Sequence, residues 1–161
     1  MLKKTSTLFL KIVLFSIAAL ILTGLLWFPQ IEGRNQFAAN RILIYFNDPF
    51  LAYVYLGSLP FFVGIYQAIR LLGLIEQNKA FTLAAVKRLR NMKYSALGLM
   101  ATIGAAMPWI FAFGQEDDAP GVVVLGLGAV LIAGVLATAC AVFQKLFQNA
   151  VDIKEENDLT V

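Results

Sequence analysis

The sequence predicts an all-α membrane protein, an antiparallel bundle of four transmembrane helices that forms a single domain over residues 1–161. Composition is the first reason: 60% of the 161 residues are hydrophobic and only 14% are charged, with a mean hydropathy of +0.75. That balance is too apolar for a soluble fold of this length. The apolar residues also gather in four runs, each long enough to cross a hydrocarbon core of about 30 Å. Finally, a polar and strongly basic segment separates the second run from the third, as in a cytoplasm-facing loop.

The first predicted span covers residues 8–28 and follows the basic residues Lys3 and Lys4. Its one charge is Lys11, whose long side chain can return its ammonium group to the headgroups. A cleaved signal peptide has a similar basic start, but its apolar core is usually about 7–15 residues and a small-residue cleavage site follows it. The run here is longer and ends at Pro29 without such a site, so we expect an uncleaved helix.

The second predicted span covers residues 49–72. Asp48 is suited to the N-cap and Pro49 to the first helical position, because together they satisfy or remove otherwise unpaired N–H groups. Pro60 deletes a backbone hydrogen bond in mid-span and should kink the helix, with Ser58 or a neighbouring helix satisfying the freed carbonyl. Such a kink can serve as a gating hinge, although proline is also common in membrane helices without that role.

Residues 73–93, the hinge, connect the second span to the third and are strongly basic. The second helix should continue to Gln77 and break over residues 78–82, with Thr82 as the N-cap of the next helix. From there the pattern is amphipathic. One face carries Phe81, Ala85, Leu89 and Met92, and the others carry Lys87, Arg88, Arg90 and Lys93. A helix over residues 83–113 would be about 46 Å long, so the second and third helices should project into the cytoplasm as a short hairpin.

The third predicted span covers residues 94–113, and Pro108 and Trp109 lie near its outer end. Two connections face the other side of the membrane. Residues 37–46 in the first are helix-compatible and could lie along the membrane interface, and an ordered loop is an equal alternative. The second, residues 114–120, contains three consecutive carboxylates. Since calcium loops space their ligands around a turn, we expect a solvated turn here.

The fourth predicted span covers residues 121–143 and is rich in small residues, which let membrane helices approach closely. The ridge consists of Ala129, Ala133, Ala137 and Ala141, beside Gly126, Gly134 and Thr138. It could pack within the chain or against a second copy, so the oligomeric state stays open. The tail, residues 144–161, continues the helix through Lys145 and Phe147 and then becomes acidic. We expect it to dock on the basic hinge, and a frayed, solvated terminus is the alternative.

The distribution of Lys and Arg predicts that both termini are cytoplasmic. Three of these residues lie in the N-terminal segment, six between residues 70 and 93 and two in the tail, against two in the opposite connections. Positive charge stays on the side from which a chain is inserted, so a multi-pass protein of the plasma membrane is indicated. The basic balance therefore reflects topology, and we expect no direct contact with nucleic acid.

The sequence gives little support for catalysis. It contains no histidine, a single cysteine (Cys140) and no carboxylate within a predicted span. It shows no metal-ligand spacing and no phosphate-binding loop, so we predict no catalytic residue, metal site or cofactor and no enzyme activity. Transport is weakened by the same scarcity of intramembrane charge. The polar path that could support it would run beside Pro60, Gln67 and Arg70.

Two segments carry a family resemblance: FTLAAVKRLRNMKY at residues 81–94 and the terminal DIKEENDLTV, with ENDLTV the more specific part. With these segments the chain resembles a bacterial family of four-span membrane proteins that is catalogued only as a domain of unknown function. In that family the gene often lies beside one for a Cro-type helix-turn-helix regulator, which implies a membrane partner for a transcription factor. The family has no established catalytic residues to transfer.

Three hypotheses follow for function. The leading one is a non-enzymatic membrane anchor or regulator that binds a cytoplasmic protein partner, such as a transcription regulator, through the hinge and tail. The residues of that surface would be Lys87, Arg88, Arg90, Lys93, Glu155, Glu156 and Asp158. The alternative is a small transport or protective, immunity-like membrane protein. The third is that the basic hinge sets topology and holds anionic lipid headgroups, each Lys or Arg contributing about 1 kcal/mol.

Overall fold

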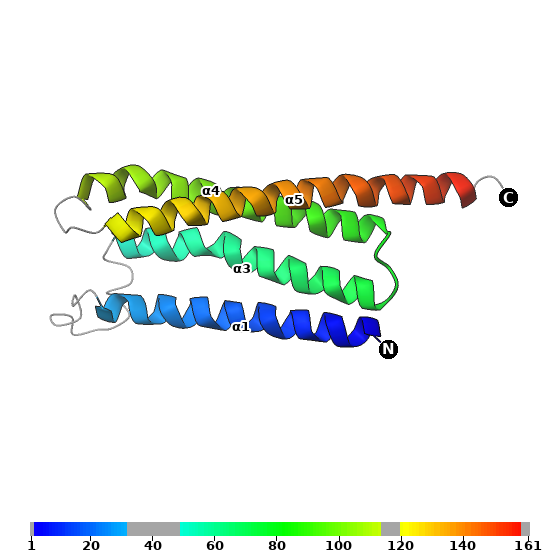
Figure 1. Cartoon of the computed structure of the whole chain (residues 1–161), viewed down its shortest axis with the longest axis horizontal. Helices are drawn as coiled ribbons and strands as arrows, with labels where there is room; N and C mark the ends of the chain where they lie inside the picture. Colours follow the sequence, from blue (N-terminus) through cyan, green and yellow to red (C-terminus); the bar gives the residue numbers. More distant parts are fainter. Residues whose placement is uncertain (1, 32–48, 114–119, 159–161) are drawn as a thin grey trace.

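A computed structural model describes residues 2–31, 49–113 and 120–158 of the chain. Four helices account for most of them: α1 (Leu2–Ile31), α3 (Pro49–Glu76), α4 (Leu83–Phe113) and α5 (Pro120–Asp158). The described ranges contain no strand. Successive helices run in opposite directions along one long axis (Figure 1). The predicted all-α, antiparallel four-helix architecture is therefore confirmed, whereas the predictions for residues 37–46 and 114–119 lie outside the described residues.

The helices contact one another mainly in chain order. α4 packs against both α3 and α5, and α1 packs against α3. Figure 1 shows α1 along one side of the bundle and the α4–α5 pair along the other. Each helix contains a stretch long and apolar enough to cross a membrane. These stretches are Thr5–Trp27, Leu51–Glu76, Leu83–Phe111 and Gly121–Asn157.

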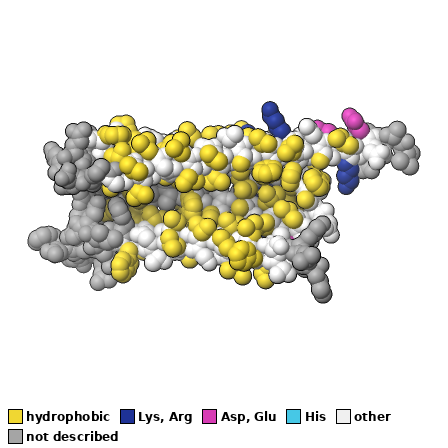
Figure 2. Space-filling model, viewed as in Figure 1, with side chains coloured by type: hydrophobic (Ala, Val, Ile, Leu, Met, Phe, Trp, Pro, Cys, Tyr) yellow, Lys and Arg dark blue, Asp and Glu magenta, His cyan; other side chains and the backbone are white. Residues whose placement is uncertain are grey.

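The buried apolar side chains among the described residues include both small ones and large ones such as Leu51. Ala85 is fully buried, and Ala133 and Ala137 are nearly so, whereas large apolar side chains are exposed along all four helices. Figure 2 shows this apolar cover over most of the bundle, with the described charged side chains on this face near one end. Small residues at helix contacts, under an apolar exterior, are the pattern of helices that pack in lipid.

The small-residue ridge of α5 packs within the chain. A Cβ atom added to Gly126 would lie 2.1 Å from the terminal methyl carbon of Met107, and one added to Gly134 would lie 3.6 Å from the sulfur of Met100. Both methionines belong to α4. α4 and α5 therefore lie close together at these glycines, and the ridge makes contacts within the chain.

The connection between α3 and α4, residues 77–82, marks what we call the hinge end of the bundle. Asn78 has a φ of 56°, its N–H donates to the carbonyl of Ile75, and the N–H of Lys79 donates to that of Leu74. This pair of bonds around a left-handed residue is the Schellman motif, which satisfies the last carbonyls of a helix. The predicted break after Gln77 is thus confirmed, and Asn78 is the residue that makes it.

Thr82 precedes α4, as predicted, but its side chain acts differently from a usual N-cap. Its carbonyl accepts hydrogen bonds from the N–H groups of Ala85 and Val86 at the start of the helix. Its hydroxyl donates to the carbonyl of Lys79, at 2.9 Å. The threonine side chain therefore tightens the connection between the two helices.

The C-terminal part of the chain is more regular than the sequence suggested. α5 is 39 residues long and runs without interruption to Asp158, or about 58 Å at 1.5 Å per residue. The predicted tail from residue 144 is thus the continuation of the fourth helix. In Figure 1 this helix passes the α3–α4 connection and projects beyond it, and we call residues 144–158 the α5 extension.

Polar contacts help to attach α1 to α3. The ammonium of Lys11 lies 2.7 Å from a carboxylate oxygen of Glu76, and both side chains are about one quarter exposed. Farther along, the hydroxyl of Tyr55 donates to the carbonyl of Leu25 at 2.6 Å. Lys11 therefore has a partner on α3, which the sequence-based interpretation of a side chain reaching only for the headgroups did not include.

Candidate functional site

The candidate site lies where α3 and α4 approach closely. Small residues make this approach possible at three levels along the two helices. A Cβ atom added to Gly98 would lie 3.5 Å from the Cβ of Pro60, and one added to Gly64 would lie 3.5 Å from the Cβ of Ser95. At the third level, a Cβ atom on Gly57 would lie 3.6 Å from that of Thr102. The hydroxyl of Tyr53 also donates to the carbonyl of Thr102. Together these contacts fix the register of the two helices.

Pro60 lies inside α3, which continues through it. The hydroxyl of Ser58 donates to the carbonyl of Tyr55 at 2.7 Å. The carbonyl that loses its N–H partner to Pro60 is that of Leu56, four residues earlier. The expectation that Ser58 would satisfy the freed carbonyl is therefore wrong, because its short side chain reaches back three residues and not two.

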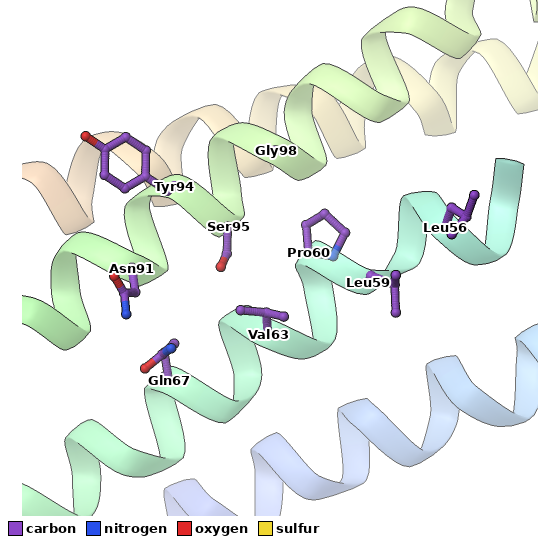
Figure 3. A pocket seen from close by; sticks show the side chains of 9 residues that line it. All are labelled: Leu56, Leu59, Pro60, Val63, Gln67, Asn91, Tyr94, Ser95 and Gly98. Atoms are coloured by element: carbon purple, nitrogen blue, oxygen red, sulfur yellow. The ribbon is translucent and has the colours of Figure 1, made fainter.

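Beside this contact lies an open groove of about 570 Å³ between the two helices (Figure 3). Its lining consists of Leu56, Leu59, Pro60, Val63 and Gln67 from α3 and Asn91, Tyr94, Ser95 and Gly98 from α4. The polar side chains lie toward the hinge end of each helix, and the leucines toward the other end. The groove is therefore apolar over one part of its length and polar over the other.

The polar part is organised by a hydrogen bond between the two helices. An Nη1 atom of Arg88 donates to the side-chain oxygen of Gln67 at 2.8 Å. Gln67 is only 8% exposed, and Arg88 is half-buried. A buried amide needs such a partner because desolvating it unpaired is costly. The bond thus joins a residue predicted for a polar path to one predicted for a partner surface.

Two further cations lie over aromatic rings near this region. The Nε of Arg70 donates to the hydroxyl of Tyr66 at 3.0 Å, and its guanidinium carbon lies 5.4 Å from the ring centroid. The ammonium of Lys93 lies 4.9 Å from the ring centroid of Tyr94, which lines the groove. Contacts of this kind hold a cation at the edge of an apolar surface.

The structure brings the predicted polar path together only in part. Pro60 and Gln67 line the same groove, whereas Arg70 is exposed on α3 outside its lining. The groove opens along the side of the helix pair and is not enclosed. The sequence grouped these residues into one path on the second helix but gave no sign of the groove, which depends on the register between α3 and α4.

The predicted partner surface falls into two groups. Lys87 and Arg90 are exposed at the start of α4, and Glu155 and Glu156 are exposed on the α5 extension. Asp158 is the last residue of α5. The extension lies beside the start of α4 through an aromatic contact between Phe81 and Phe147, whose ring centroids are 5.2 Å apart. Docking of the tail on the hinge through charge, as the sequence suggested, stays a prediction.

The described residues contain no group of three or more His, Cys, Asp or Glu side chains placed to hold a metal ion. Cys140 is buried in α5 and forms no disulfide. The chemistry available in the groove is accordingly that of amide, hydroxyl, phenol and guanidinium groups beside apolar side chains. Such groups bind an anion or a polar headgroup through hydrogen bonds and charge.

Four helices, each with a stretch long and apolar enough to cross a membrane, define an integral membrane protein of the multi-pass class. The chain belongs to the family described as "Protein of unknown function (DUF2975)", whose model matches residues 32–161. It is also similar to the "Uncharacterized membrane protein YoaS" of Bacillus subtilis (strain 168), with 38% identity over 159 residues. That alignment covers 98% of this chain and 99% of the relative. No solved structure matches the chain.

These comparisons confirm the resemblance to a bacterial membrane family of unknown function. The matched region includes the hinge and the tail, the two segments on which the resemblance was based. Neither description names an enzymatic activity, a substrate or a partner. The molecular role therefore has to be argued from the structure of the hinge end.

Proposed function

We propose that this protein is a non-enzymatic membrane anchor or regulator whose working surface is the hinge end of the bundle. The observation that carries the proposal is the α5 extension, a helix that continues past the α3–α4 connection (Figure 1). A helix needed only to span the bilayer requires about 20 residues. We infer that the additional length lies outside the hydrocarbon, where a soluble protein could contact it.

The side chains exposed there are suited to a protein partner. Lys87 and Arg90 contribute positive charge from α4, and Glu155 and Glu156 contribute negative charge from α5. Ile153, on the same extension, is 67% exposed. An exposed apolar side chain among charges of both signs is typical of a recognition surface with an apolar centre and a polar rim.

The orientation that we propose for this surface is cytoplasmic, at the plasma membrane. The excess of Lys and Arg in the N-terminal segment, in residues 70–93 and in the tail supports it, because translocated loops are depleted in these residues. A soluble cytoplasmic protein is then the partner class. The family resemblance favours a helix-turn-helix regulator, which the membrane protein would bind without contacting nucleic acid itself.

The test is affinity capture of the tagged protein from mild-detergent extracts after cross-linking in cells. We expect at least one soluble protein to be captured by the unchanged chain and lost with Lys87→Glu/Arg90→Glu. This pair leaves the Arg88–Gln67 hydrogen bond in place. Arg34→Glu/Arg41→Glu changes the charge by the same amount in a connection predicted to face the other side, and should keep the partner. Capture that is identical for all three proteins would contradict the proposal.

A small transport or protective membrane protein is the second candidate, and one observation favours it. Pro60, the internal proline of α3, lines the same groove as Gln67. Solute flux into liposomes that falls on substitution of Gln67 or Arg70 would support this role. Flux equal to that of protein-free liposomes would oppose it.

A further inference from the structure

The groove between α3 and α4 changes in chemistry along its length. At one end Leu56, Leu59 and Val63 are 67%, 55% and 47% exposed, an apolar wall open to the surroundings. Toward the hinge end the lining becomes polar, with Gln67 from α3 and Asn91 and Ser95 from α4 (Figure 3). A ligand that fills the groove would therefore be apolar over one part and polar over the other.

The length of the groove matches one leaflet of a bilayer. From Leu56 to Gln67 the helix advances about 16 Å, at 1.5 Å per residue. Half of a hydrocarbon core is about 15 Å. The groove is therefore about as long as the hydrocarbon of one leaflet is thick, and a single acyl chain can follow it.

Positive charge continues the groove beyond its polar end. Arg88 is bonded to Gln67, and Lys93 lies over the ring of Tyr94, which is part of the lining. Lys87 is one helical turn from Asn91 and exposed, so it belongs to the same side of α4. Among the described residues Arg88 forms no ion pair, and its other N–H groups can donate to a phosphate.

We propose that this groove binds one anionic phospholipid from the leaflet on the hinge side. Its acyl chain lies along Leu56, Leu59 and Val63, and its phosphate accepts hydrogen bonds from Arg88 and Asn91, with Lys87 contributing charge. This inference shares Lys87 with the surface of the proposed function but requires no soluble partner, so lipid binding to the purified protein tests it separately.

Two features favour a phospholipid over other ligands of similar chemistry. A soluble phosphate would engage the cationic end but leave the apolar wall unused, so it should bind weakly. A zwitterionic phospholipid would cover the wall but add a positive group beside Arg88 and Lys87. An anionic phospholipid covers the apolar wall with its acyl chain and places a net negative headgroup beside the basic side chains.

Native mass spectrometry of the purified full-length protein in detergent tests the assignment. Phosphatidylglycerol and phosphatidylcholine with identical acyl chains are titrated separately, and the fraction of protein with one bound lipid is measured. We expect phosphatidylglycerol to bind with the lower dissociation constant, and Arg88→Gln to raise that constant about fivefold, which corresponds to about 1 kcal/mol. Lys154→Gln removes the same charge from an exposed position on the α5 extension and should leave binding within about twofold of the unchanged chain.

A second pair of variants tests the apolar part without changing charge. Val63→Trp places bulk in the groove and should lower retention of phosphatidylglycerol, whereas Leu131→Trp, on an exposed position of α5, should not. Added inorganic phosphate should not displace the lipid at millimolar concentration. Equal affinity for the two lipids, equal effects of Arg88→Gln and Lys154→Gln, or displacement by phosphate would each overturn the proposal.

Discussion

The ammonium of Lys11 and the carboxylate of Glu76 lie 2.7 Å apart, joining the start of α1 to the last residue of α3. α1 contacts mainly α3, so this ion pair helps to hold α1 in the bundle. We expect a coupling free energy of about 0.5–1 kcal/mol, the upper range for partly exposed pairs. A double-mutant cycle of Lys11→Gln and Glu76→Gln, followed by thermal unfolding in detergent, measures it. Strictly additive effects of the two substitutions would show that the pair contributes nothing.

The contact between Pro60 and Gly98 predicts a large difference between two glycines of the same helix. Gly98→Leu should destabilise the protein by about 1–3 kcal/mol, because the new side chain must separate α3 from α4. Gly104→Leu is the matched control, since a Cβ at Gly104 has nothing within 4 Å. Unfolding in detergent compares the two variants. Equal stabilities would mean that α3 and α4 do not approach at Gly98 as described.

Asn78, just after α3, has a left-handed backbone conformation. The effect of a substitution there on stability should therefore depend on how readily the new residue adopts a positive φ. Asn78→Gly should be close to neutral, because glycine adopts positive φ readily. Asn78→Ile should cost about 1–2 kcal/mol, because a β-branched side chain clashes with the carbonyl in this conformation. Lys79→Ile makes a similar change at the next position, which lacks positive φ, and should cost less. The same loss at both positions, measured by thermal unfolding, would remove the argument for a Schellman cap.

The contact between Phe81 and Phe147 predicts how the α5 extension is held. Phe147→Ala should speed amide hydrogen exchange in residues 148–158 and leave residues 121–143 unchanged, because only the extension loses its aromatic partner. Leu146→Ala changes an exposed neighbour and should have a smaller effect. Exchange measured by mass spectrometry on the detergent-solubilised protein distinguishes the two. Unaltered exchange in the Phe147 variant would indicate that the extension is held by other contacts.

The sequence was sufficient to predict the four helices because long apolar runs are a strong and local signal. Pro49 begins α3, and the break after Gln77 lies where the polar residues suggested it. The close packing of α5 could also be anticipated, since alanine and glycine recur there at a regular four-residue spacing. These features depend on residues that are near one another in the chain.

The candidate site was harder to predict because it depends on how separate helices are placed. The sequence analysis named Gln67 for a polar path and Arg88 for a partner surface. Only the register of α3 against α4 shows that their side chains form a hydrogen bond. The small residues that set this register, such as Gly64 and Ser95, lie on different helices and form no conspicuous repeat in the sequence. Lys11 and Glu76 are likewise 65 positions apart, so their pairing follows from the packing of α1.

The account depends most on the hinge end facing the cytoplasm, and cysteine accessibility tests this directly. In a Cys140→Ala background, single cysteines are placed at Lys79, in the α3–α4 connection, and at Glu155, on the α5 extension. Gln115→Cys, in the acidic connection, serves as the control for the opposite side. We predict that a membrane-impermeant maleimide labels the control in intact cells and labels the other two positions only after the membrane is opened. Labelling of Lys79→Cys or Glu155→Cys in intact cells would contradict the account.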